Sequence, residues 1–178
     1  MKNIFYPLAA SLIFLSSAWV VVNATDYTLK EGHVIQFKSK DPTGVFKTMK
    51  GSIKFDESDL ENSKFDLAFE VSSISTGNGM MNKKAQTAEW FDASKYAQIK
   101  YVSSKIEKTG EGFNVIGKLT IKGVTKDKTV PLKVSKSGSD LTFSGSFIVN
   151  RMDFKVGKTS DAVPNNMNIN YSIPVSKK

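Results

Sequence analysis

The chain has 178 residues, a length typical of a single domain, and a formal net charge of +8. It contains no cysteine, which excludes disulfides, thiolate metal sites and cysteine nucleophiles. Arg151 is the single arginine among 25 basic residues, whereas proteins that read nucleic acids usually depend on arginine forks. We therefore expect no nucleic-acid partner, and weak, transient contact with an anionic membrane surface stays open.

The first 24 residues have the pattern of an export signal. Lys2 supplies a positive start, residues 8–22 an apolar stretch, and Val22-Asn23-Ala24 a small-residue cleavage site. The alternative is an uncleaved membrane anchor, because residues 4–22 carry no charge and are almost long enough to span a bilayer. We expect cleavage after Ala24, a single domain at residues 25–178, and a periplasmic or secreted location.

Most of the remaining chain alternates between apolar and polar residues. In the segment 113–121, for example, Phe113, Val115, Leu119 and Ile121 fall on one side and the polar residues on the other. A period of two is typical of a half-buried β-strand. In chain order it predicts eight strands, within residues 27–37, 49–55, 65–71, 99–103, 113–121, 130–134, 141–149 and 167–175.

Two segments depart from this pattern. Between Ser75 and Lys95, Met81, Ala85, Ala88 and Phe91 recur every three or four residues, which predicts one short amphipathic helix that covers a barrel mouth. Residues 150–166 are polar and predict a long connection. Pro174, in the last predicted strand, indicates a sheet edge or a strand end because proline cannot donate a ladder hydrogen bond.

Eight strands with one apolar face and almost no helix must bury that face against themselves. We predict an all-β fold, an eight-stranded antiparallel barrel, with a two-sheet sandwich as the alternative. The apolar face is expected to point inward. An outward apolar face would place the lysines of the other face, such as Lys54 and Lys118, unpaired in a narrow lumen. The mid-strand glycines Gly51, Gly117 and Gly145 indicate either bent strands or space for an apolar ligand.

The segment 115–126, VIGKLTIKGVTK, resembles the G-x-L-T-I-x-G-V-T-K motif of the YceI-like family. Further matching pieces follow in the family's order at residues 51–56 (GSIKFD), 74–78 (ISTGN), 90–92 (WFD) and 150–154 (NRMDF). The resemblance implies an exported, lipocalin-like barrel that holds a long isoprenoid amphiphile, such as a quinone or a polyprenyl chain, in an apolar channel. The chain departs from the family at residues 81–85, MNKKA, where many members have R-D-x-H-L.

We accordingly expect a non-catalytic lipid-binding protein of the cell envelope. The alternative is a stress or structural envelope protein whose barrel core is filled. No metal and no cofactor other than a bound lipid are expected, and the oligomeric state stays open, with a dimer as one possibility. Fifteen residues are predicted to contact the ligand: Phe37, Met49, Ile53, Phe55, Phe69, Met81, Trp90, Phe91, Tyr101, Phe113, Leu119, Phe143, Phe147, Arg151 and Tyr171.

Two polar residues have competing interpretations. Arg151 is predicted either to pair with Asp153 and anchor the connection 150–166, or to bind a diphosphate or a quinone carbonyl as a fork. His33 is the only histidine, so it cannot form a multi-histidine metal site. We expect it to be a hydrogen-bonded structural residue.

Overall fold

The computed structural model describes residues 24–39, 42–160 and 162–178, so the predicted export signal lies outside the described residues apart from Ala24. The described chain is mostly β-strand, with one α-helix and two short 3₁₀ turns, at Val71–Ser73 and Arg151–Phe154. The helix is α1 (Gly79–Gln86). The strands are β1 (Thr25–Leu29), β2 (Val34–Lys38), β3 (Thr43–Phe46), β4 (Met49–Phe55), β5 (Lys64–Glu70), β6 (Ile74–Ser75), β7 (Gln98–Thr109), β8 (Gly112–Ile121), β9 (Val124–Ser137), β10 (Asp140–Asn150) and β11 (Asn166–Lys177).

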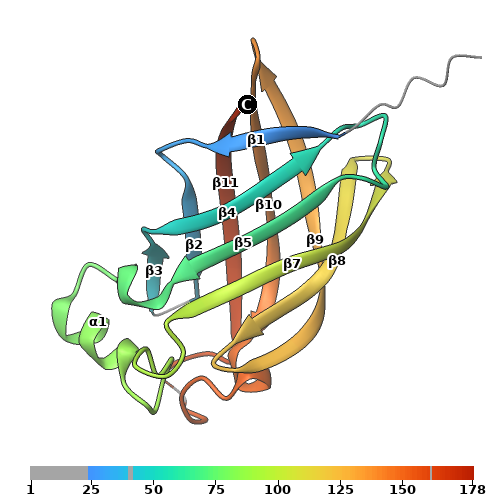
Figure 1. The fold of residues 1–178 in the computed structure, drawn as a ribbon. Helices are drawn as coiled ribbons and strands as arrows, with labels where there is room; N and C mark the ends of the chain where they lie inside the picture. Colours follow the sequence, from blue (N-terminus) through green and yellow to red (C-terminus); the bar gives the residue numbers. More distant parts are fainter. Residues whose placement is uncertain (1–23, 40–41, 161) are drawn as a thin grey trace, which may run out of the picture.

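Eight of these strands close a barrel (Figure 1). Neighbours are hydrogen-bonded in the order β1-β4-β5-β7-β8-β9-β10-β11, and β11 returns to β1, where Tyr27 lies opposite Lys177. All of these pairings are antiparallel. The predicted eight-stranded barrel is therefore confirmed and the sandwich is not. The short strands β2, β3 and β6 continue the sheet outward from β11.

Pro174 does not lie on a sheet edge, so that prediction is wrong. β11 pairs with β10 along almost its whole length, and on its other side with β2 up to Ser172 and with β1 from Val175 onward. Pro174 lies where the partner on that side changes from β2 to β1. The missing N–H is tolerated there because the ladder is already interrupted.

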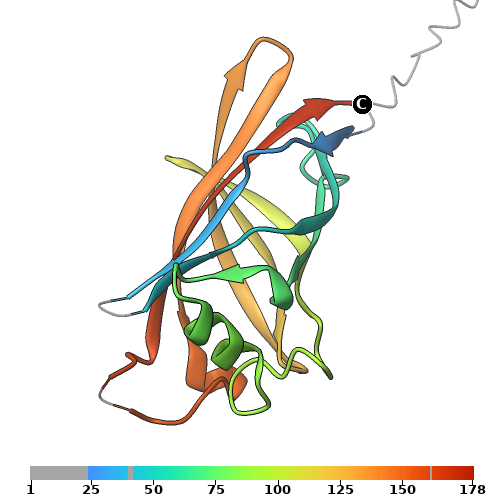
Figure 2. The same ribbon diagram turned by 90° about the vertical axis from the view of Figure 1, so that its left-hand side faces the viewer.

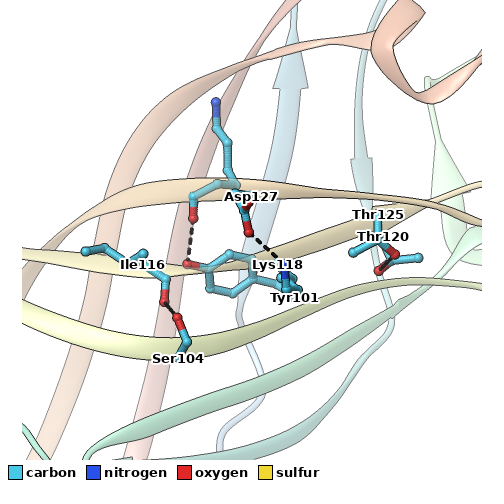
Figure 3. Close-up of polar contacts among 8 residues, drawn as sticks. Tyr101, Ser104, Ile116, Lys118, Thr120, Thr125 and Asp127 are labelled. Atoms are coloured by element: carbon cyan, nitrogen blue, oxygen red, sulfur yellow. Dashed lines mark hydrogen bonds and ion pairs between the residues drawn. The ribbon is translucent and has the colours of Figure 1, made fainter.

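The apolar face points inward, as predicted. Along β8, Phe113, Val115 and Leu119 are buried, whereas Lys118 is exposed. Figure 3 shows part of this outer surface, where the Lys118 ammonium lies 2.8 Å from the carboxylate of Asp127 on β9. Exposed ion pairs of this kind contribute about 0–1 kcal/mol each, so the barrel is stabilised mainly by its apolar interior.

The barrel has two different ends (Figures 1 and 2). At the mouth end lie α1 with its flanking segments (76–97), the β8–β9 turn (122–123) and the described parts of the β10–β11 connection (151–160 and 162–165). At the opposite end, which we call the packed end, lie the connections 56–63, 110–111 and 138–139. In Figure 1 the mouth end is at the bottom. No helix of the described residues is long and apolar enough to cross a membrane.

The single helix begins at a side-chain cap. The Asn78 side-chain oxygen accepts hydrogen bonds from the backbone N–H groups of Met80 and Met81, at 2.9 and 3.2 Å. The helix ends at Gln86, so Ala88 and Phe91 lie beyond it and its predicted extent was too long. Phe91 is held instead by a turn, in which its N–H donates to the carbonyl of Ala85 at 3.0 Å.

Candidate functional site

An apolar cavity of about 320 Å³ occupies the half of the barrel next to the mouth. This volume is at the lower end of the range of roughly 300–1,000 Å³ that is usual for ligand pockets. Its walls come from inward residues of every strand except β1 and β4, together with α1 and the mouth connections. Apart from tyrosines and a tryptophan, its polar lining residues are Thr76, Lys84 and Arg151. The cavity is thus built for a hydrocarbon with few polar contacts.

The floor of the cavity is a cluster of aromatic rings at the packed end. The ring of Phe143 lies 5.2 Å from those of Phe55 and Phe65, and the ring of Phe113 lies 5.3 Å from that of Phe55, all edge to face. Phe143 is fully buried. Phe65 both belongs to this cluster and lines the cavity. The rings therefore fill one half of the barrel and close the cavity on that side.

The cavity reaches solvent beside α1. Met81 and Lys84, one helical turn apart, both line the cavity, and both are exposed, Met81 by 37%. A side chain that both lines the cavity and is exposed to solvent marks the place where the cavity opens. The cavity is therefore blind at the aromatic floor and open at the mouth, next to the helix that was predicted to cover it.

Ten of the fifteen predicted contact residues line this cavity: Phe37, Phe69, Met81, Trp90, Phe91, Tyr101, Leu119, Phe147, Arg151 and Tyr171. The other five lie elsewhere in the core. Ile53, Phe55, Phe113 and Phe143 are buried at the packed end, and Met49 is buried at the start of β4. The alternation along a strand shows which side chains point inward, but not how far along the barrel axis each one lies. Ligand contact itself stays a prediction for all fifteen.

Further lining residues were missed by the sequence analysis. Ile35, Leu67, Ile99, Val130 and Met167 line the cavity from strands, and the same period of two that predicted their neighbours would have found them. Other lining residues come from the connections, where no periodicity exists to find them: Pro42, Thr76, Val156 and Val163.

The mid-strand glycines serve close packing rather than leaving a slot. Added side-chain atoms at Gly117 and Gly145 would overlap the carbonyl oxygens of Val102 and Pro131 on the neighbouring strands. A tyrosine also passes close to each of these glycines. None of the three predicted glycines lines the cavity. This favours the interpretation in which they allow the strands to bend and approach one another.

These two tyrosines are Tyr101 and Tyr171, and each reaches across a glycine of the neighbouring strand to a carbonyl oxygen on the strand beyond it. The Tyr101 hydroxyl lies 2.8 Å from the carbonyl oxygen of Val115 and 3.2 Å from that of Lys128. The Tyr171 hydroxyl donates to the carbonyl of Pro131 at 2.5 Å. Burial raises the pKa of both phenols. They therefore stay neutral donors at physiological pH.

Arg151 anchors the mouth connection, but not through Asp153, so the predicted pair is wrong. Arg151 as a whole is only 5% exposed, and its guanidinium donates to four carbonyl oxygens, at 2.8 to 3.1 Å, which belong to Val156, Lys158, Val163 and Pro164. A fifth contact reaches the Met152 sulfur at 3.2 Å. A guanidinium has five N–H donors, so the described contacts occupy all of them. Arg151 therefore has no fork left for a ligand head group.

Burial lowers the pKa of Arg151 from its ordinary value by desolvation, but an arginine stays cationic. The Asp153 carboxylate lies instead 3.9 Å from the Lys126 ammonium. Among the described residues the Arg151 charge is thus stabilised by carbonyl dipoles and has no carboxylate partner. Its guanidinium also stacks on Trp90, 5.6 Å from the ring centre, and Lys84 lies 5.9 Å from the same ring.

Two buried ring nitrogens have no hydrogen-bond partner among the described residues: Nε1 of Trp90 and Nε2 of His33. His33 therefore lacks the hydrogen bond that was expected at this atom. Trp90 is the more informative of the two because it lines the cavity near the opening. A buried indole N–H without an acceptor costs roughly 1–3 kcal/mol, which makes this atom a candidate donor to a ligand oxygen.

The described residues contain no group of three or more histidine, cysteine or acidic side chains that could hold a metal ion.

Comparison with known proteins agrees with this architecture. The model of the YceI-like domain matches residues 19–175. The chain belongs to the YceI-like family. It is 31% identical over 189 residues to the UPF0312 protein of Serratia proteamaculans, an alignment that covers 98% of this chain and 96% of the relative.

Solved structures share the fold. Burkholderia cenocepacia BcnA superimposes with a TM-score of 0.76 at 30% identity, over 80% of this chain and 95% of BcnA. A polyisoprenoid-binding domain from Saccharophagus degradans, described as implicated in plant cell wall breakdown, superimposes with a TM-score of 0.66. Its identity is only 13%, over 88% of this chain and all of that domain, so the likeness concerns the fold.

Proposed function

We propose that this protein binds a long apolar amphiphile, an isoprenoid quinone, a polyprenyl chain or a similar lipid, and shields it from water in the cell envelope. The observation that carries this proposal is the blind apolar cavity with one opening. Membership of the YceI-like family and the shared fold of a polyisoprenoid-binding domain support the same ligand class. The protein acts as a carrier and not as an enzyme.

The geometry orients the ligand. Only an apolar tail fits against the aromatic floor, where burying it gains roughly 25 cal/mol per Å² of apolar surface. The head group then lies at the mouth, near the Trp90 indole N–H that lacks a protein acceptor. Arg151 contributes its positive charge to the mouth but no free donor. Affinity therefore comes mainly from the tail, and Trp90 selects head groups that carry an oxygen acceptor.

The alternative is a stress or structural envelope protein with a filled barrel core. The packed half of the barrel, which aromatic rings fill, agrees with this alternative. Native mass spectrometry of protein purified without detergent separates the two functions. A lipid-sized mass that copurifies with the chain supports the carrier. A bare chain that also fails to bind added quinone contradicts it.

Two matched variants test whether the cavity is the binding site. Val130 and Val134 lie on β9 and both pack into the core, but only Val130 lines the cavity. Val130→Phe adds a ring to the cavity and should weaken quinone binding about tenfold or more. The ring displaces several CH₂ groups of the ligand, and each buried CH₂ group contributes roughly 0.8 kcal/mol to binding. Val134→Phe is the control and should change the affinity less than about twofold. Equal affinities for both variants would rule out this cavity as the site.

A further inference from the structure

The connections at the two ends of the barrel differ in charge. The described connections at the mouth end contain seven basic and three acidic side chains, and Asp161 adds one further acid to this part of the sequence. The connections at the packed end, residues 56–63, 110–111 and 138–139, contain five acidic and no basic side chains. The mouth connections therefore carry a net positive charge around the cavity opening, whereas the acidic loops of the packed end lie near lysines of the strand ends, such as Lys136 and Lys177.

Most of the positive charge at the mouth is not used in ion pairs among the described residues; the exception is Lys126, which lies 3.9 Å from Asp153. Within residues 24–39, 42–160 and 162–178, the lysines at positions 83, 84, 95, 155 and 158 have no carboxylate within ion-pair distance. The two cations that hold the mouth connections together bind carbonyl oxygens instead. Lys122 donates to the carbonyls of Glu89 and Lys155, at 3.1 and 2.9 Å, and Arg151 donates to four more. Holding the loops in this way leaves the charge of the mouth unneutralised.

Beside the opening, the same end exposes apolar side chains. Met80, on the first turn of α1, is 79% exposed, more than any other large hydrophobic residue in the described chain. Met81 follows it and also lines the cavity. Methionine is flexible and polarizable, so it can insert among lipid chains of varied shape. Lysines around an exposed apolar tip are the combination that binds an anionic lipid surface.

We propose that the protein docks with its mouth end on the surface of an anionic lipid bilayer, with Met80 and Met81 against the lipid and the lysines over the head groups. The packed end then points away from the surface. In this orientation the opening beside α1 faces the bilayer. An apolar tail can then move between the membrane and the cavity without crossing bulk water.

The test uses the chain from Thr25 onward, which contains every strand of the barrel, in its empty form with phosphatidylcholine vesicles that contain or lack phosphatidylglycerol. We expect binding to the anionic vesicles that weakens as salt is raised, and little binding to the neutral ones. Lys83→Glu with Lys158→Glu should lower the affinity about thirtyfold, since each lysine near the surface contributes roughly fivefold. Lys64→Glu with Lys108→Glu makes the same change of net charge near the packed end and should lower it less than about threefold.

Trp90 reports the orientation, because Trp19 lies in the predicted export signal and Trp90 is the only tryptophan after it. Lipids brominated on their acyl chains should quench its fluorescence when the empty protein binds. Three results would overturn the proposal: no binding to anionic vesicles, equal losses in the two double variants, or binding without quenching of Trp90. None of these measurements involves the ligand, so their failure is distinct from the failure of the proposed lipid binding.

Discussion

The packed half and the hollow half of the barrel are built by the same strands. β10 shows the difference most directly, because Phe143 and Phe147 lie four residues apart on its inward side. Phe143 contacts three other aromatic rings and is fully buried, whereas Phe147 lines the cavity and is only partly buried. One face of one strand can therefore serve stability at one end and ligand capacity at the other. The comparison predicts which substitutions will affect folding and which will affect binding.

The largest effect is expected at the packed end. Phe143→Ala should lower the free energy of unfolding by about 3–5 kcal/mol, because it removes a buried ring and leaves a cavity that its neighbours cannot fill. Phe147→Ala is the matched control on the same strand and should cost about 2 kcal/mol or less, while weakening quinone binding. Chemical denaturation and a quinone titration measure the two quantities. Similar losses of stability would mean that the two halves are not distinct.

A smaller effect is expected at the mouth. Arg151→Met keeps an apolar stem but leaves four carbonyl oxygens without their donor, and should destabilise the protein by about 2–4 kcal/mol. Hydrogen exchange should accelerate in residues 156–164 before it does in the strands of the packed end. Lys155→Met removes an exposed charge from the same connection and should change stability by less than about 0.5 kcal/mol. Unchanged exchange in Arg151→Met would show that the guanidinium does not hold this connection.

The smallest effect concerns pH and the tyrosines that fasten the hollow half. Burial raises the pKa of Tyr101 and Tyr171 above that of an unfolded chain, so folding favours the neutral phenols. Their contribution is complete below about pH 10 and is lost as the pH rises further. Unfolding free energies measured between pH 8 and 11 should therefore decrease. Tyr101→Phe should show a shallower decrease, and an identical slope would contradict this assignment.

The architecture could be predicted because one signal dominates it. The period of two predicted eight strands with their lysines facing outward. Because almost no helix was available to cover a flat sheet, the same pattern also predicted that the sheet closes on itself. The predictions that were wrong concern features that depend on contacts between residues far apart in the sequence. Nothing local shows that Pro174 lies between two partner strands, or that residues 27–37 split into β1 and β2. The helix was drawn too long because Phe91 points inward from a turn, at a position that mimics helical spacing.

The candidate site was predictable in its chemistry more than in its location. The inward aromatic residues were found, but Phe55 and Phe147 have the same pattern in the sequence and lie at opposite ends of the core. Arg151 was expected to find an acid in the sequence nearby, whereas the fold offers it a ring of carbonyl oxygens. Backbone acceptors have no sequence signature, so such a partner could not be predicted.

The ring cluster of Phe55, Phe65, Phe113 and Phe143 has one more consequence, because it fixes the depth to which a guest can enter. A floor at a fixed depth limits the length of tail that the cavity can bury. Tails shorter than the hollow leave empty volume beneath them, and tails longer than it must keep their surplus units outside the rim. In the carrier that we propose, such a floor would favour lipids with one number of repeating units over their homologues, and moving the floor by one aromatic residue would change the preferred length.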